Sequence, residues 1–154
     1  MELILVMALL ATVLAFSAPS LSRSLRERYL NQEAARFLAL TEHGRDEAVS
    51  QGVPMVVWID AKAQRFGLEP KTGYEAPEMP GREYAVNPDI QIEITKAPKI
   101  PGTGSVVRAI EFAPDGLPEP SSIDLLRLVD RFDSVVTIAK TSDGWGYEIL
   151  EETK

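Results

Sequence analysis

The sequence predicts an α+β protein in which one long N-terminal helix packs on an antiparallel β-sheet domain. Up to about residue 52, apolar residues recur at steps of three and four, which is the period of a helix. Beyond that point, short runs rich in β-branched residues alternate with Pro, Gly and Asp turns. This order of a helix followed by strands is typical of α+β proteins. We therefore expect a helical segment at residues 1–52 and a globular sheet domain at residues 53–154.

The first part of the helix is apolar. Residues 3–18 carry no charge, and they lie between Glu2 and Pro19. As a helix they would span about 24 Å, while a bilayer core of about 30 Å needs about 20 residues. We expect a transmembrane segment at about residues 1–20. Pro19 should kink the helix rather than end it, because the apolar periodicity continues beyond it.

The second part of the helix is amphipathic. Gly52 and Pro54 predict its end, so the whole element would be about 75 Å long. The stripe expected to face the sheet domain comprises Leu30, Ala34, Phe37, Leu38, Thr41 and Ala48.

Three hypotheses account for the apolar start. A secretory signal peptide would have a basic start and a small-residue cleavage site; "AFSA" suits the site, but Met-Glu is not a basic start. A plain membrane anchor gives no reason for Glu2. The third hypothesis comes from "ELILVMALLATVLAFSAP", which resembles the N-terminus of type IV pilin-like proteins, including the pseudopilins of type II secretion. Glu2 and Pro19 have the spacing of that family's Glu and Pro. The resemblance implies a leader and first mature residues upstream of Met1.

The resemblance gives Glu2 a role in assembly. A carboxylate at the edge of a bilayer is costly and usually paired. In the family its partner is the N-terminal amine of a neighbouring subunit, so Glu2 would set the register between adjacent helices. Arg23, Arg26 and Arg28 form a membrane-proximal basic cluster that would meet lipid headgroups or acidic residues of a neighbour. By the positive-inside rule this cluster would lie in the cytoplasm, whereas the resemblance places the globular domain in the periplasm.

The rest of the chain predicts a series of short strands. Residues 71–89 and 98–104 are rich in Pro, Gly and charge and predict loops. The expected strands are residues 53–60, 65–70 and 90–97, one strand before the turn at 114–116, and then 123–130, 134–141 and a last strand ending at 150.

Three segments narrow the resemblance to the H-type minor pseudopilins. These are the helix-to-strand junction "RDEAVSQGVPMVVWID", the stretch "IEFAPDGLPEPSSIDL" and the closing "GWGYEI". The resemblance implies a non-enzymatic, single-pass subunit of the bacterial inner membrane that supports export of folded proteins. Its partners would be other pseudopilins, inner-membrane lipid and, during processing, a prepilin peptidase.

The sequence offers little other chemistry. The net charge of −7 disfavours nucleic acid. With no Cys and one His, His43, we expect no metal, cofactor or catalytic site. Asp115-Gly116 and Asp143-Gly144 predict turns rather than calcium sites, and Trp58 and Trp145 are expected in the core or on a sheet face. Two alternatives stay open: a minor type IV pilin of pilus assembly or DNA uptake, and a periplasmic enzyme or binding protein with a signal peptide.

Overall fold

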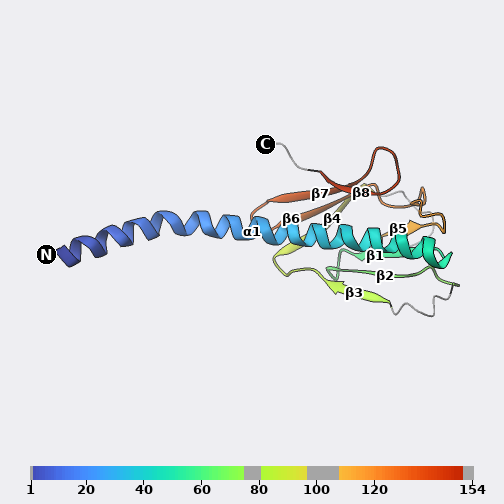
Figure 1. The fold of residues 1–154 in the computed structure, drawn as a ribbon, viewed down its shortest axis with the longest axis horizontal. Coiled ribbons are helices and arrows are strands. Elements are labelled where there is room, and N and C mark those ends of the chain that lie inside the picture. The colour runs from blue at the N-terminus through green and yellow to red at the C-terminus, as the bar shows by residue number, and fades with distance from the viewer. Residues whose placement is uncertain (1, 75–80, 97–107, 151–154) are drawn as a thin grey trace.

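The computed structural model describes residues 2–74, 81–96 and 108–150, without the side chains of residues 2, 5, 13–26, 96 and 108. One helix, α1, precedes eight strands. Figure 1 shows that the first part of α1 projects away from the sheets while its second part lies along them. The bounds are α1 Glu2–Gln51, β1 Met55–Asp60, β2 Arg65–Pro70, β3 Arg82–Ala85, β4 Ile90–Lys96, β5 Arg108–Phe112, β6 Leu125–Asp130, β7 Val135–Lys140 and β8 Tyr147–Leu150.

The helix follows the sequence prediction closely. It is 50 residues long and continues through Pro19 without a break in its assignment. It ends at Gln51, and Gly52 follows at φ 65°, the left-handed conformation that glycine adopts most easily after a helix. The predicted stripe is buried except for Leu38, which is half-buried, and Leu40 joins it at 5% exposure. Thr41 is a polar member of the stripe, and its hydroxyl donates to the Leu38 carbonyl at 2.7 Å.

The strands form two antiparallel four-stranded sheets rather than one. Their orders are β3-β2-β1-β5 and β4-β6-β7-β8. The helix contacts strands of both sheets, so its buried stripe closes a core that both sheets share. Every second residue of β1 points into this core, as its alternating burial shows. On the other face, the Trp58 side chain lies over Gly67 of β2, where a Cβ atom would collide with the indole.

An aromatic cluster docks the helix on the first sheet. The rings of Phe37 and Phe66 meet edge to face with centroids 5.2 Å apart, and Tyr84 of β3 lies 5.8 Å from Phe66. The Arg36 guanidinium lies 4.4 Å above the Tyr84 ring, which closes the cluster with a cation–π contact. Gly44 marks the closest approach, because a Cβ there would lie 3.0 Å from a Leu68 methyl group.

The turn between β1 and β2 links the two sheets. Gln64 sits there at φ 55°. Its carbonyl accepts a hydrogen bond from the Val86 N–H at 3.0 Å, and its side-chain oxygen accepts one from the Ile92 N–H of β4 at 2.9 Å. This one turn residue of the first sheet therefore accepts hydrogen bonds from the residue that follows β3 and from β4 of the second sheet.

The predicted strands are all present in the described residues, and two expectations need correction. Residues 71–89 were expected to be a loop, but β3 lies within them, paired with β2. The charged residues Arg82 and Glu83 hide the strand in the sequence, because an exposed edge strand does not need alternating apolar residues. Trp145 was expected in the core or on a sheet face, but it lies in the β7–β8 turn and is 63% exposed. The predicted loop at 98–104 lies outside the described residues.

Candidate assembly surfaces

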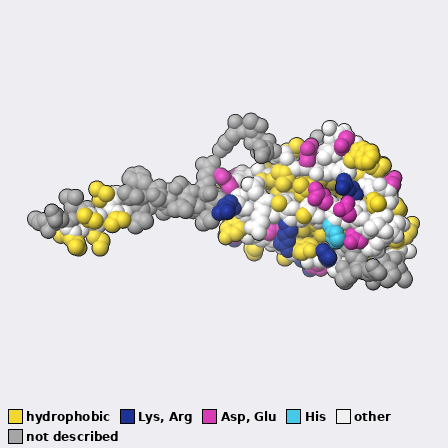
Figure 2. All heavy atoms as spheres, viewed as in Figure 1, with side chains coloured by type: hydrophobic (Ala, Val, Ile, Leu, Met, Phe, Trp, Pro, Cys, Tyr) yellow, Lys and Arg dark blue, Asp and Glu magenta, His cyan; other side chains and the backbone are white. Residues whose placement is uncertain are grey.

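Among the described residues, the projecting part of α1 presents an exposed apolar surface. Figure 2 shows apolar side chains gathered at the outer end of the helix, far from the sheets. Their exposed fractions run from 53% to 74%. They are Leu3, Ile4, Val6, Met7, Leu9 and Leu10. At 100° per residue these positions spread over about 220° of the helix circumference, which is wider than the stripe of a helix that buries only one face.

A transmembrane segment was predicted at about residues 1–20. Among the residues that the structure describes, no helix is both long enough and apolar enough to cross a membrane.

The structure places Glu2 and Pro19 on this projecting helix. Glu2 is the first residue of α1, and Pro19 lies inside it, well before the first buried residue, Leu30. The structure brings neither of them next to the sheets. A proline inside a helix lacks the N–H that would bond four residues back, so the carbonyl of Ala15 loses its helical donor.

The three arginines lie at the base of the projection. Arg28 is exposed. At 100° per residue the backbone positions of Arg23 and Arg26 lie about 60° apart, while Arg28 lies about 140° from Arg23. The backbone positions of these three residues, which we call the basic collar, are therefore distributed around the helix axis rather than along one face.

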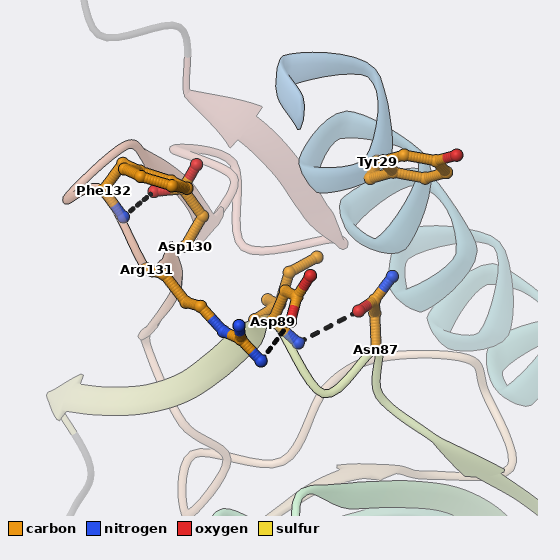
Figure 3. Close-up of a pocket in the computed structure, with 7 residues that line it drawn as sticks. Tyr29, Asn87, Asp89, Asp130, Arg131 and Phe132 are labelled. Atoms are coloured by element: carbon orange, nitrogen blue, oxygen red, sulfur yellow. Dashed lines mark hydrogen bonds and ion pairs between the residues drawn. The ribbon is translucent and has the colours of Figure 1, made fainter. Parts of the chain in front are cut away.

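A small hollow lies where the helix leaves the domain. It has a volume of about 40 Å³, and three separate segments line it. We call it the neck pocket, and its lining residues are Tyr29, Asn87, Asp89, Ile90, Asp130, Arg131 and Phe132. Figure 3 shows Tyr29 reaching it from α1, Asn87 and Asp89 from the β3–β4 connection, and Arg131 and Phe132 from the β6–β7 turn.

Hydrogen bonds hold the polar wall of the neck pocket in place. The Asp130 carboxylate accepts from the N–H groups of Phe132 and Ser134, both at 2.8 Å, which fixes the β6–β7 turn. Arg131 pairs with Asp89, whose own N–H donates to the side-chain oxygen of Asn87 at 3.0 Å. The Arg131 side chain remains 65% exposed.

The aromatic rim of the neck pocket faces solvent. Tyr29 is 54% exposed and Phe132 is 63% exposed. Sequence analysis did not identify this pocket, because its residues come from positions 29, 87–90 and 130–132. The only signals were the polar turns "NPD" and "RFD", which by themselves indicate a change of chain direction.

The β7–β8 turn presents Trp145 on a rigid support. The N–H of Thr141 donates to the Gly146 carbonyl at 2.9 Å, and the Gly146 N–H donates back to the Thr141 hydroxyl oxygen at 3.1 Å. The Asp143 carboxylate accepts from the Thr141 hydroxyl at 2.5 Å and from the Trp145 N–H at 3.0 Å. These bonds hold the pKa of Asp143 below its usual range, with the Thr141 hydroxyl as the largest cause. A negative charge is thus fixed beside an exposed indole.

The remaining candidates in the sequence are structural. Asp115 accepts from the Leu117 N–H at 3.0 Å, and Gly116 and Gly144 have positive φ, so both Asp-Gly pairs form turns as predicted. His43 is half-buried with its Nε2 atom 3.8 Å from Glu47. Within the described parts of the chain, no group of three acidic, His or Cys side chains could hold a metal ion.

Comparison with known proteins supports the fold. No family model matches the chain, and no curated protein matches it either. Two solved structures of the minor pseudopilin EpsH from the type 2 secretion system of Vibrio cholerae are similar to it. The first has a TM-score of 0.53 at 15% identity and covers 83% of this chain and 98% of that one. The second has a TM-score of 0.52 at 13% identity and covers 81% and 92%. A long helix on antiparallel sheets, matched over nearly the whole length of these structures, means that this chain has a pseudopilin-like fold.

Proposed function

We propose that the chain is a non-enzymatic minor pseudopilin of a type II secretion system, supporting export of folded proteins across the outer membrane. The observation that supports this most directly is the form of α1. Its second part is docked on two sheets, while its first part projects with apolar side chains that are 53% to 74% exposed. Apolar surface of this extent costs free energy in water, so the projecting part needs lipid or neighbouring helices around it.

In this proposal the chain is anchored in the inner membrane by the projecting helix, with the sheet domain in the periplasm. Glu2, at the tip of α1, pairs with the N-terminal amine of a neighbouring pseudopilin. An ion pair in a low dielectric is strong when made, and breaking it by removing one partner costs about 3–5 kcal/mol. Glu2 would therefore fix the axial register between helices.

Pro19 has a role of its own in this proposal. Because it removes one helical hydrogen bond, the projecting part can bend relative to the docked part. The basic collar of Arg23, Arg26 and Arg28 lies between the two parts. It would meet lipid headgroups before assembly and acidic side chains of neighbours after it.

The test is complementation in a bacterium that lacks its own H-type minor pseudopilin. We compare the wild-type chain with Glu2→Ala and with Glu42→Ala, which removes an exposed Glu from the docked part of the same helix. Glu2→Ala should leave the amount of folded protein in the membrane unchanged. It should lower both co-purification of other pseudopilins and release of a secreted enzyme by about tenfold or more. Glu42→Ala should behave as wild type.

Equal secretion by the two variants would overturn the role of Glu2. The N-terminus of the protein from its own membranes gives a second test by mass spectrometry. A methylated residue upstream of Met1 would support prepilin processing. A start near Ala18 in a soluble fraction would overturn the proposal and favour a periplasmic protein with a signal peptide.

A further inference from the structure

Two turns of this chain, at residues 115–117 and 143–145, have the same backbone design. In each turn the Asp Oδ1 atom accepts a hydrogen bond at 3.0 Å from the N–H two residues later, and the intervening glycine has positive φ. The first turn ends on Leu117, which is 39% exposed, whereas the second ends on Trp145, which is 63% exposed. Since leucine serves in the same turn, the indole of Trp145 is not needed to form it.

The Trp145 turn also has more open surroundings than the first turn. A Cβ atom on Gly116 would lie 2.8 Å from a Val49 methyl group, so the first turn is packed on α1. A Cβ atom on Gly144 or Gly146 would have nothing within 4 Å outside its chain neighbours. Figure 1 shows the β7–β8 turn in the half of the domain away from the projecting helix. A partner that reaches this half of the domain therefore has access to the indole.

The carboxylate of Asp143 cannot be separated from this indole. Its Oδ1 atom accepts from the Thr141 hydroxyl at 2.5 Å and from the N–H of Trp145 itself at 3.0 Å. The same two bonds, with the Thr141 hydroxyl first, hold the pKa of Asp143 below its usual range, so the group is charged at neutral pH. Among the described residues, Asp143 forms no ion pair and its Oδ2 atom accepts no hydrogen bond. A surface that covers the indole therefore also covers an unpaired negative charge.

The turn and the strand ends beside it are net negative. Their charged side chains are Lys140, Asp143 and Glu148. Asp124 lies beside them, because its carbonyl accepts from the Lys140 N–H at 2.9 Å. One positive and three negative charges leave a net charge of −2. A charge that is buried at an interface without a partner is costly, so a protein that binds here must bring a positive charge.

We propose that the Trp145 turn binds an arginine side chain of a neighbouring protein, with the guanidinium stacked on the indole and paired with Oδ2 of Asp143. A guanidinium is planar, so it can lie on an aromatic face while its N–H groups reach a carboxylate. Tryptophan is the strongest aromatic partner of a cation. This inference states the chemistry of one partner for the assembly role proposed above and rests on that role for its biological meaning, but the binding of arginine can be measured independently.

The rigidity of the turn favours this use of Trp145. The Thr141 N–H donates to the Gly146 carbonyl at 2.9 Å, and the Gly146 N–H donates back to the Thr141 hydroxyl oxygen at 3.1 Å. A side chain on a turn that is already held in this way loses less conformational freedom on binding than one on a flexible loop. Tryptophan is also enriched among the residues that dominate binding energy at interfaces.

A different protein is the expected source of the arginine. The whole chain has a net charge of −7, so two copies repel one another at long range. In addition, five arginines among the described residues already pair with carboxylates of the same chain. They are Arg36, Arg45, Arg65, Arg127 and Arg131.

The binding of arginine is tested by nuclear magnetic resonance on the full chain in mild detergent. The chain has two tryptophans and therefore two indole N–H signals. N-acetylarginine amide is the probe, and N-acetylcitrulline amide, which has a similar shape but no charge, is its control. The Trp145 signal should move about threefold further with the arginine compound, with the Trp58 signal as the reference. Asp143→Asn should remove the difference, because the amide oxygen can keep both hydrogen bonds of the turn while the charge is lost. Asp115→Asn, in the matching turn, should have no effect.

The partner is identified by cross-linking in the cells that make the protein. Ser142, which is exposed in the same turn, is replaced by the photoreactive amino acid p-benzoylphenylalanine, and mass spectrometry maps the residue that it captures. Asp143→Asn or Trp145→Ala should lower the product yield about tenfold, while Asp115→Asn should not. Replacing the partner's arginine nearest the captured residue by Gln should lower the yield equally, and adding Asp143→Asn should cause no further loss. Thermal unfolding of each variant confirms that it is folded.

Three results would overturn the proposal. These are equal shifts of the Trp145 signal with the two compounds, a product yield that depends neither on Asp143 nor on an arginine of the partner, and capture of no protein other than a second copy. None of the variants alters the projecting helix. Failure here together with the expected Glu2→Ala result would therefore refute the arginine site and leave the assembly role standing. A shift specific to arginine together with a failed Glu2→Ala test would do the reverse.

Discussion

Replacing Phe37 by Ala should strongly destabilise the protein, because this side chain joins α1 to the first sheet. Phe37 is 1% exposed, and its ring meets Phe66 edge to face at 5.2 Å and 77°. Truncating a buried Phe costs about 3–5 kcal/mol. The edge-to-face geometry contributes about 0.5–1.5 kcal/mol beyond buried area, so we expect a loss near 4 kcal/mol. That is a large share of the roughly 5–15 kcal/mol that stabilises a typical domain.

The measurement is urea unfolding of the full chain in a mild non-ionic detergent, followed by tryptophan fluorescence and circular dichroism. The midpoint should fall while the slope stays constant. Tyr29→Ala is the matched control, because it removes an aromatic side chain that is 54% exposed on the same helix, and it should change stability by no more than about 0.5 kcal/mol. A loss below about 1 kcal/mol for Phe37→Ala, or an equal loss for both variants, would contradict the docking geometry.

Three other predictions concern close packing, pH and the link between the sheets. Gly44→Val should lower stability by about 1–3 kcal/mol in the same unfolding assay, because even a Cβ atom at this position would lie 3.0 Å from a Leu68 methyl group. A variant as stable as wild type would mean that the helix shifts freely. Burial raises the pKa of Tyr147, with a smaller contribution from the charge of Asp124. The stabilisation that this shift contributes is therefore fully present below the unfolded-state tyrosine pKa of about 10. It is lost as the pH rises from there toward the higher pKa of the folded state. Tyr147→Phe should reduce the loss of stability at alkaline pH. At neutral pH it should cost about 1 kcal/mol, because the 2.6 Å hydrogen bond from the Tyr147 hydroxyl to a backbone carbonyl is lost. An unchanged alkaline decline would refute this assignment. Gln64→Gly should be more stable than Gln64→Ala by about 1 kcal/mol. Both variants lose the side-chain hydrogen bond to β4, but only alanine keeps the backbone strain of φ 55°. The opposite order of stability would show that the turn changes conformation.

Several features of the fold could be predicted from the sequence because their causes are local. The step of three and four from Leu30 to Ala48 identifies the buried face of α1, and five of the six residues predicted for it are buried. Gly52 marks the helix end because its positive φ depends on the absence of a side chain. The turn before β2 and the two Asp-Gly turns likewise depend on residues a few positions apart.

The tertiary structure decided what depends on residues far apart in the chain. An alternating pattern shows that a strand has one buried face, but it does not show which strand lies beside it, so the division into two sheets was not predicted. The exposed edge strand β3 was missed because only one of its four residues, Tyr84, packs against the core, so the strand shows no apolar alternation. The neck pocket exists only because the β3–β4 connection and the β6–β7 turn meet beside α1, and Trp145 is exposed because it lies in the turn between β7 and β8. The sequence by itself therefore determined every element except β3, together with the apolar start of the helix, since these follow from local periodicity and composition. Only the folded chain placed Trp145 at one end of the second sheet and the neck pocket at the other, because that separation is set by strand pairing between distant segments.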